Sequence, residues 1–348
     1  MQRRAFYMSF KGNPWRTVAT TVTGASHIRK WLREQNRKYN SIGECENDAD
    51  NIKMLNQDRV EFSLGTPVNT GNESKVNPAV IAVSDGHGGA KYIRSGIGAG
   101  FAVLGACRVA TLDFNLSNDM SGAAIDQVVS HLKTRFMDAW FNDVDDYTKK
   151  YPFNDEEVMH LSENARADLL NNPRKAYGCT LLWAIGYNDM LITLQLGDGN
   201  IILLYEDGRV ESTSDLSLHE PGEETESLCT LKSPHEIQHQ VFRSDEEGEG
   251  LPILISVSSD GLYKSYEHNE DFFKIPHICL NTLKDNNFNN ESVGAIIKDF
   301  LQVVTEKGAG DDTTLGIVYN FDKLSKNVRI TQSQATPSIA VETQGASK

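Results

Sequence analysis

The sequence predicts an α+β fold in which mainly antiparallel sheets are covered by helices. Short apolar or alternating runs rich in β-branched residues recur along the chain, and several follow one another through tight turns. Segments with one apolar helical face lie between them. Because strands joined by short turns pair antiparallel and amphipathic helices must bury one face, we expect sheets inside and helices outside.

Eight runs predict the strands. Two connections, 186–189 and 206–209, carry the small and polar residues that reverse a chain, and they make much of the sheet antiparallel. The predicted strands are 18–23, 59–64, 79–84, 179–185, 190–196, 201–205, 252–258 and 314–319.

Three segments have helical periodicity. Residues 124–141 and 291–304 each place their large apolar side chains on one side, and the first of them is expected in the core. A glycine-rich helix is predicted at 92–111. No internal repeat accompanies these elements, which favours a single layered domain.

We expect this domain at residues 1–321, with an insertion at about 29–53 and a tail at 322–348. The insertion is dense in Arg, Lys, Asn and Glu, although its first residues could form a helical turn. The tail is polar and small-residue-rich, and it cannot bury enough apolar surface to offset the entropy of ordering. It is therefore predicted to be disordered.

Composition narrows the classes of partner and compartment. The formal net charge of −14 opposes nucleic acid and anionic membrane as partners. The five cysteines form no CxxC pair, which argues against disulfides and zinc. The basic N-terminus is interrupted before any apolar run, and no other stretch is expected to reach the length of a membrane span. These features predict a cytoplasmic protein.

Three acidic motifs carry the predicted chemistry. They contain Asp85, Asp260 and Asp311, each beside a glycine or within a glycine-rich segment and each expected at the carboxyl end of a hydrophobic strand or in the turn after it. Asp-Gly alone is an ordinary turn pair. Three such motifs beside buried strands instead predict converging carboxylates, which suit Mg²⁺ or Mn²⁺.

Six motifs occur in the order and approximate spacing of the type-2C metal-dependent protein phosphatase family, which the chain resembles over roughly residues 17–320. Gly24-Ala-Ser-His27 ahead of them resembles a bacterial branch. The motifs are Asn56-Gln-Asp58, Asp85-Gly-His-Gly-Gly89, Gly178-Cys-Thr180, Gly197-Asp-Gly199, Ser259-Asp-Gly261 and Asp311-Asp-Thr-Thr314. The resemblance implies a four-layer α-β-β-α sandwich of two mainly antiparallel sheets flanked by helices.

The resemblance also implies the metal ligands. Asp85 would bridge two Mn²⁺ or Mg²⁺ ions, Asp260 and Asp311 would complete one site, and Gly86 would offer its carbonyl. The implied enzyme is a serine/threonine phosphatase that hydrolyses phosphomonoesters with a metal-activated water. Its implied partners are a phosphoprotein substrate and a cognate serine/threonine kinase.

Other residues receive supporting roles from the same resemblance. Asp58 would hold metal-bound water, and His87 would orient the cluster, with a plain turn role as its alternative. Gln57 and Asp198 would lie in the surroundings of the ligands. Asp312 is expected to cap or bond the threonines that follow it.

Two candidates for holding the substrate phosphate remain. Relatives place an arginine three residues before the motif of Asn56, where this chain has Lys53, and His27 lies earlier because of the insertion. Lysine acts as a point charge without the fork of arginine, so weaker orientation of the phosphate is expected. Both residues could instead be solvated surface groups.

A third ion is doubtful on this interpretation. Lys175 stands about where several relatives have an aspartate for it, and Asp168 is the nearest substitute. The acidic region 213–250 lacks the flap pattern by which relatives select substrates, so the substrate cannot be predicted.

Two alternative functions share the predicted metals. One is a catalytically silent phosphoprotein-binding module, supported by Lys53 and Lys175 and opposed by the complete set of metal ligands. The other is a hydrolase of small phosphate esters.

Overall fold

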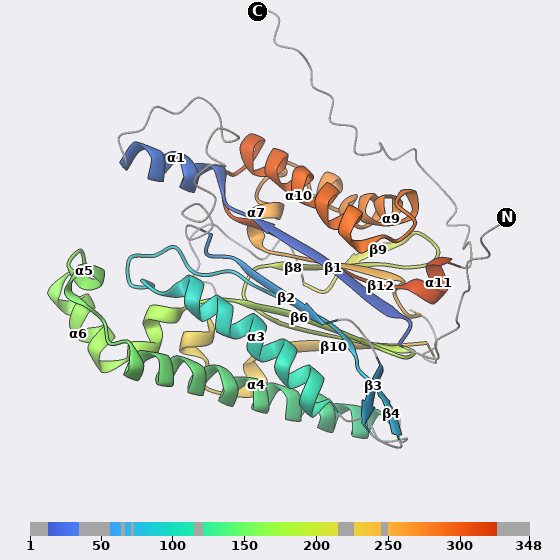
Figure 1. Cartoon of the computed structure of the whole chain (residues 1–348), viewed down its shortest axis with the longest axis horizontal. Coiled ribbons are helices and arrows are strands. Elements are labelled where there is room, and N and C mark those ends of the chain that lie inside the picture. The colour runs from blue at the N-terminus through green and yellow to red at the C-terminus, as the bar shows by residue number, and fades with distance from the viewer. Residues whose placement is uncertain are drawn as a thin grey trace, which may run out of the picture.

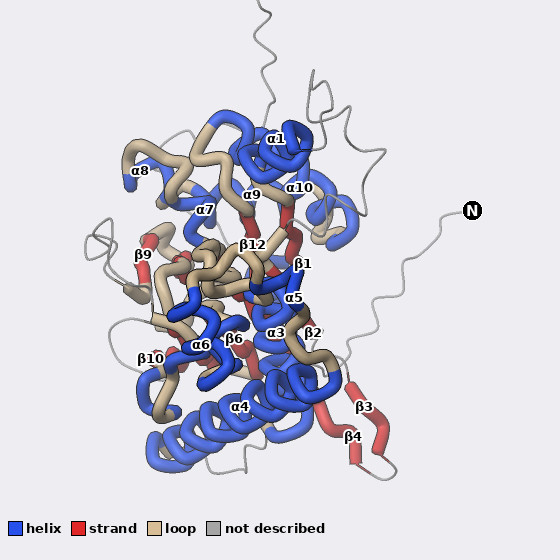
Figure 2. The backbone as a smooth tube through the Cα atoms, turned by 90° about the vertical axis from the view of Figure 1, so that its left-hand side faces the viewer, coloured by secondary structure: helices blue, strands red, loops and turns tan. Residues whose placement is uncertain are grey.

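The structure, a computed structural model, describes residues 13–34, 56–63, 67–70, 73–114, 121–214, 226–244 and 250–325. Two five-stranded sheets pack face to face, with helices on both outer faces (Figures 1 and 2). Every strand pairing in them is antiparallel. The α-β-β-α sandwich is therefore confirmed.

The first sheet joins the two ends of the domain. Its strand order is β1-β12-β11-β8-β9, and β1 pairs along its whole length with β12, Trp15 opposite Asn320 and Val22 opposite Thr313. All eight residues of β12 are buried because helices cover one face and the second sheet the other. The strands are β1 (Trp15–Val22), β8 (Asn200–Leu204), β9 (Val210–Ser212), β11 (Leu254–Ser258) and β12 (Thr313–Asn320).

The second sheet has the order β10-β7-β6-β5-β2. Its central strands are buried on both faces, which explains their nearly continuous apolar sequence. The strands are β2 (Arg59–Ser63), β5 (Ala79–Ser84), β6 (Leu181–Tyr187), β7 (Met190–Leu196) and β10 (Gln238–Arg243). A separate hairpin, β3 (Pro67–Thr70) with β4 (Glu73–Val76), projects from the body (Figure 2).

Two groups of helices form the outer layers (Figure 1). The pair α3 (Ser95–Asp113) and α4 (Gly122–Lys150) covers the second sheet, and α9 (Ile275–Asp285) with α10 (Asn290–Lys307) covers the first. Both α4 and α10 are capped at their start, by Ser121 and Asn289. The remaining α-helices of the described residues are α1 (Ala25–Glu34), α5 (Asp155–Val158), α6 (Glu163–Asn171), α7 (Asp260–Tyr263), α8 (Asn269–Phe272) and α11 (Phe321–Ser325).

Three apolar cores alternate with these layers. One lies between the sheets around Trp15, Ile81 and Ile255, and one lies under each pair of helices, around Phe136 and Leu301. The helix predicted at 124–141 belongs to the core as expected and runs nine residues further, to Lys150. Burial on both sides of both sheets fixes the positions of the strand ends.

Some boundaries differ from the predictions. Residues 322–325 belong to α11, where Leu324 is buried, so the ordered domain extends past the predicted start of the tail. Residues 29–34 of the predicted insertion continue α1, whereas the rest of the insertion and of the tail lies outside the described residues. Strands β3, β4, β9 and β10 and helix α9 were not predicted, since the first three are short and the exposed half of β10 is polar.

One helix corrects the expectation about membrane spans. Among the described residues, α3 is long and apolar enough to cross a membrane by length and composition. However, 56% of that window is buried inside the fold, where small residues such as Ala99, Ala102 and Ala106 let the helix pack closely. Its apolar composition is accounted for by the core.

Candidate active site

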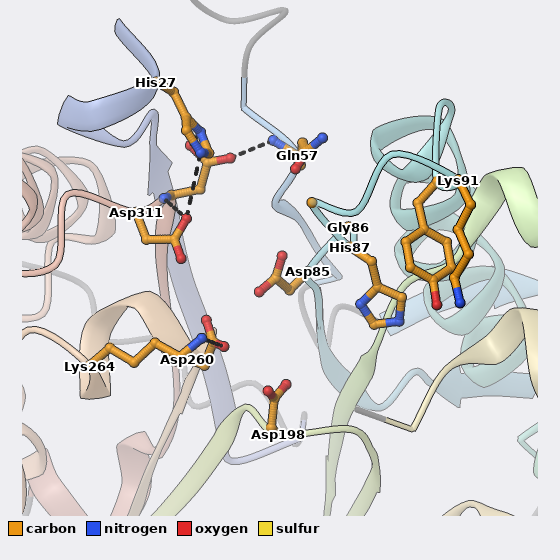
Figure 3. Close-up of a pocket in the computed structure, with 13 residues that line it drawn as sticks. His27, Gln57, Asp85, Gly86, His87, Lys91, Asp198, Asp260, Lys264 and Asp311 are labelled. Carbon is orange, nitrogen blue, oxygen red and sulfur yellow. Dashed lines mark hydrogen bonds and ion pairs between the residues drawn. The ribbon is translucent and has the colours of Figure 1, made fainter. Parts of the chain in front are cut away.

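A cavity of about 490 Å³ lies at the end of the sandwich where β5 and β11 end and β12 begins (Figure 3). It brings together all but two of the predicted site residues. Its walls are His27, Gln57, Asp85, Gly86, His87, Gly88, Lys91, Tyr92, Asp198, Asp260, Lys264, Asp311 and Asp312. Of the two exceptions, Asp58 is buried behind the wall, and Lys53 lies outside the described residues.

Asp85 is held by the end of β5. Its N–H donates to Thr180 Oγ1 and its carbonyl accepts from Thr180 N–H, both at 2.9 Å. A Cβ on the next residue, Gly86, would lie 2.9 to 3.0 Å from the backbone of Ser95, Gly96 and Gln57. Only glycine therefore lets the chain pass here between α3 and the segment before β2.

Asp260 and Asp311 come from the neighbouring strands β11 and β12. Asp260 follows β11 as predicted and begins α7. Asp311 does not follow a strand: it lies between α10 and β12, in the loop entered through Gly310 at φ +78°. The prediction was wrong about the preceding element, but antiparallel pairing of the two strands still places the start of β12 beside the end of β11.

Asp312 has a different role from the predicted one. Its Oδ1 accepts from Gly24 N–H at 2.7 Å and lies 3.1 Å from His27 Nδ1, while its Oδ2 accepts from Gln57 N–H at 2.7 Å. It therefore bonds to the segments before α1 and β2 and not to the threonines that follow it. This buried carboxylate fixes both His27 and Gln57 at the rim of the cavity.

Asp58 lies under the cavity floor at 1% exposure. Its Oδ2 accepts from Ser259 Oγ at 2.6 Å and Thr314 Oγ1 at 2.8 Å. Its Oδ1 is buried and has no hydrogen-bond partner among the described residues. Burial, together with the charge of Asp312, raises the pKa of Asp58 to about 7.

The two histidines differ in their surroundings. The hydrogen bond with Asp312 raises the pKa of His27, which favours its cationic form at the rim. Burial lowers the pKa of His87, whose Nε2 lacks a partner among the described side chains and whose ring lies 4.8 Å from that of Tyr92. His27 is thus suited to an anion and His87 to a neutral hydrogen bond.

Asp198 occupies the turn between β7 and β8. The Gln195 amide donates to the two carbonyls that flank this residue, those of Gly197 at 3.2 Å and Gly199 at 2.9 Å. Gly197 adopts φ +99°, a conformation that favours glycine. The turn holds the Asp198 carboxylate in the cavity wall opposite the rim of His27 (Figure 3).

Sequence reasoning missed three wall residues, Lys91, Tyr92 and Lys264. Lys264 Nζ forms an ion pair and a hydrogen bond with Asp260 Oδ2. The spacing of four residues from Asp260, at the start of a helical turn, was the signal that could have identified it. Lys91 Nζ lies 4.9 Å from the centre of the Tyr92 ring.

The position proposed for a substitute third-ion ligand is taken by an ion pair. Lys175 Nζ lies 2.7 Å from both carboxylate oxygens of Asp168. This pairing satisfies Asp168 without a metal ion.

The carboxylates of the cavity repel one another. Burial, and then the charges of Asp58, Asp260 and Asp311, raise the pKa of Asp85 well above its usual range. Burial, and then the charge of Asp198, raise the pKa of Asp260, although Lys264 opposes this. Such crowding is costly unless a cation neutralises it.

The donor set fits divalent cations. The cavity offers oxygen atoms from Asp85, Asp260, Asp311 and Gly86, and hard oxygen ligands are what Mg²⁺ and Mn²⁺ prefer. Asp260 Oδ1 is buried with no partner from the described chain. No group of three His, Cys, Asp or Glu side chains among the described residues is arranged closely enough to hold a metal ion on its own.

Comparison with known proteins identifies the family. The sequence profile described as "Protein phosphatase 2C" matches residues 53–302, well over half of the chain. The chain belongs to the protein phosphatase 2C family. As a member it is a metal-dependent protein serine/threonine phosphatase, whose cofactor is a pair of Mn²⁺ or Mg²⁺ ions and whose substrate is a phosphoprotein. The match gives the silent binding module no support.

Solved structures of bacterial phosphatases also resemble this phosphatase 2C chain. A bacterial serine phosphatase is 14% identical, with a TM-score of 0.48 and coverage of 87% of this chain and 97% of that one. Stp1 from Staphylococcus aureus is 14% identical, with a TM-score of 0.47 and coverage of 92% and 99%. The catalytic domain of PstP, in complex with two manganese ions, is 13% identical, with a TM-score of 0.44 and coverage of 88% and 97%. No curated protein matches the chain.

Proposed function

We propose that this phosphatase reverses the action of a cognate serine/threonine kinase on a cytoplasmic protein, with Asp85, Asp260, Asp311 and the Gly86 carbonyl as its metal ligands. One observation carries the assignment of the residues. Oxygen groups from three separate segments, after β5, after β11 and before β12, line one cavity although these segments are far apart in the sequence. A solvated acidic surface would not require their convergence.

The proposed ligands and the neighbouring cationic side chains have separate roles in the reaction. When bound, the pair of cations supplies Lewis acidity, which activates water and neutralises phosphoryl charge. The carboxylate of Asp312 holds His27 at the rim, where its positive charge can attract the phosphate. Lys91 adds a second cation on the opposite wall (Figure 3).

The buried groups keep this arrangement in place. The hydroxyls of Ser259 and Thr314 hold Asp58 beneath the floor, so its charge acts on Asp85 without reaching solvent. His87 is fixed by its contact with Tyr92 and offers a neutral ring nitrogen. Rigid support of this kind preserves the positions of the reacting groups.

The test is phosphate release from a phosphothreonine peptide with Mn²⁺ and with EDTA, for the wild type and for Asp260→Ala. We expect turnover only with Mn²⁺ and a loss of at least about a hundredfold in the variant, because a metal ligand is removed. The matched control is Asp271→Ala, since Asp271 is an exposed carboxylate paired with Lys274 away from the cavity. Equal activity in Asp260→Ala and Asp271→Ala would refute the ligand assignment.

A free phosphorylated metabolite belongs in the same assay. We expect faster hydrolysis of the peptide, because family membership makes a phosphoprotein the substrate. A preference for the metabolite by more than about tenfold, or 1.4 kcal/mol in transition-state stabilisation, would support the small-ester hydrolase instead.

A further inference from the structure

Lys264 lies in a wall of the cavity that is otherwise rich in carboxylates (Figure 3). It ends the turn of α7 that Asp260 begins, and its N–H donates to the Asp260 carbonyl at 2.8 Å. A separation of four residues on a helical turn places both side chains on the same side. Local backbone geometry therefore directs the lysine to this carboxylate.

The two partners of this ion pair are unequally buried. The side chain of Asp260 is 9% exposed, whereas that of Lys264 is 52% exposed. Asp260 is fixed by the end of β11, while the lysine reaches it from solvent on a flexible stem. The Asp260 carboxylate is therefore held in place, whereas the Lys264 ammonium group can move away from it.

Three other lysine ion pairs in the described part of the chain differ from this one. Lys149–Asp146, Lys175–Asp168 and Lys274–Asp271 all have carboxylates that are 49% exposed or more. Exposed pairs of this type contribute little to stability because water solvates both partners. The pair at Asp260 is distinguished by a carboxylate that water hardly reaches.

Other carboxylates share the cavity with Lys264, since Asp198 and Asp311 line it together with Asp260. One Asp260 oxygen receives the ammonium group, and the other, Oδ1, is buried with no partner from the described residues. Lys264 thus occupies an oxygen of a carboxylate that we assign as a metal ligand.

We propose that Lys264 is a tethered counter-ion, which neutralises Asp260 in the metal-free enzyme and must be displaced when a divalent cation binds there. The inference rests on the metal-dependent function stated above. The proposed role of Lys264 has two opposite effects, one on stability and one on metal affinity. The lysine stabilises the metal-free protein, because it reduces repulsion among the carboxylates, and it weakens metal binding, because it competes for the same oxygen.

Calorimetric titration of the whole protein with Mn²⁺ tests the competition. We expect Lys264→Met to bind Mn²⁺ about tenfold more tightly than the wild type, the effect of removing one charge-assisted hydrogen bond that metal must otherwise break. Lys264→Arg keeps the charge and should stay close to the wild type. Lys274→Met, which breaks an exposed pair outside the cavity, should not change the affinity.

Thermal unfolding separates this role from ordinary packing. In EDTA, Lys264→Met should unfold at a lower temperature than the wild type. In saturating Mn²⁺, the variant should unfold at the same temperature as the wild type or at a higher one. A lysine with only a structural role would lower the unfolding temperature equally in both conditions, and that result would overturn the proposal.

The titration also distinguishes the role of Lys264 from the metal-dependent function. Unchanged or weaker Mn²⁺ binding by Lys264→Met, with clear binding by the wild type, would overturn the role of Lys264 and leave the metal-dependent function intact. Absence of Mn²⁺ binding by the folded wild type would refute both.

Discussion

Two clusters of buried charge in this molecule are built in opposite ways. Arg94, 7% exposed, donates to both oxygens of Glu157 at 2.7 and 2.8 Å, to the carbonyls of Tyr151 and Pro152, and to Tyr177 Oη at 2.8 Å. At the active site, by contrast, Asp85, Asp260 and the underlying Asp58 crowd together, and the last two each bury an oxygen without a partner in the described chain.

The difference separates a structural ionic cluster from a functional one. Buried polar groups in a stable fold find hydrogen-bond partners, and the Arg94 cluster meets that requirement within the chain. The carboxylate cluster meets it only in part: Lys264 pairs with Asp260, whereas the buried oxygens of Asp58 and Asp260 lack partners in the described chain, in agreement with a cation site. Breaking the first should cost stability, whereas breaking the second should cost activity.

The largest expected effect comes from Asp85→Asn. Phosphate release with Mn²⁺ should fall about a thousandfold, because the amide is a poor metal ligand and the carboxylate is expected to contact both ions. In EDTA the variant should withstand more urea than the wild type, since one of the crowded charges is gone. If Asp85→Asn were less active and also less stable in EDTA, the carboxylate cluster would not differ from the Arg94 cluster in the way described above.

Arg94→Met tests the other cluster. The loss of the cation from a buried, fully bonded site should lower the free energy of unfolding by about 3 kcal/mol in urea titrations. Arg108→Met is the matched control: Arg108 pairs with Asp143 on the surface, and its loss should cost at most about 1 kcal/mol. Equal losses in the two variants would show that the Arg94 cluster is not stabilising.

Asp58→Asn should change how the stability of the metal-free protein depends on pH. The folded pKa of Asp58 is raised from 3.8 to about 7, so its protonated form stabilises the fold below pH 3.8 and this contribution is lost as pH rises through 7. In EDTA, the stability of the wild type should therefore decline over this range relative to Asp58→Asn. Urea unfolding at several pH values measures the difference, and parallel curves would contradict it.

Glu157→Gln should show the opposite sign and the smallest effect. The hydrogen bond with Arg94 lowers the pKa of Glu157 from 4.5, so its stabilisation is present above pH 4.5 and is lost as pH falls through the lower folded value. The variant should be about 1 kcal/mol less stable at pH 7, a value reduced for solvent screening, and should approach the wild type in acid. A constant difference at every pH would exclude the charge as its cause.

Local signals in the sequence predicted much of the fold and the cavity wall. Asp85 directly follows an apolar strand run and Asp260 follows another after one serine, and such runs bordered by glycine reveal where strands end. Eight of the wall residues were predicted on this basis and on the resemblance. Local sequence patterns were sufficient to predict a wall residue wherever the end of a single strand determines the position of that side chain.

Contacts between distant segments could not be predicted in this way. The bonds of Asp312 to Gly24 and Gln57 span 288 and 255 residues, and no local pattern distinguishes it from an ordinary capping aspartate. The Arg94 cluster likewise depends on how α3 packs beside the start of α5. Lys53, the other phosphate-binding candidate, stays a prediction because it lies outside the described residues.

The pairing of β1 with β12 has a consequence for biosynthesis. Strand β1 cannot pair until β12 has been synthesised, because β12 is its only sheet partner in the described structure and lies at the far end of the domain sequence. Asp311 and Asp312 precede that last strand, so a ribosome-bound chain cannot complete the cavity until synthesis passes Asn320. A nascent copy of this phosphatase that lacks β12 therefore cannot remove phosphate from any protein, and catalytic competence arises only after Asn320 has been synthesised.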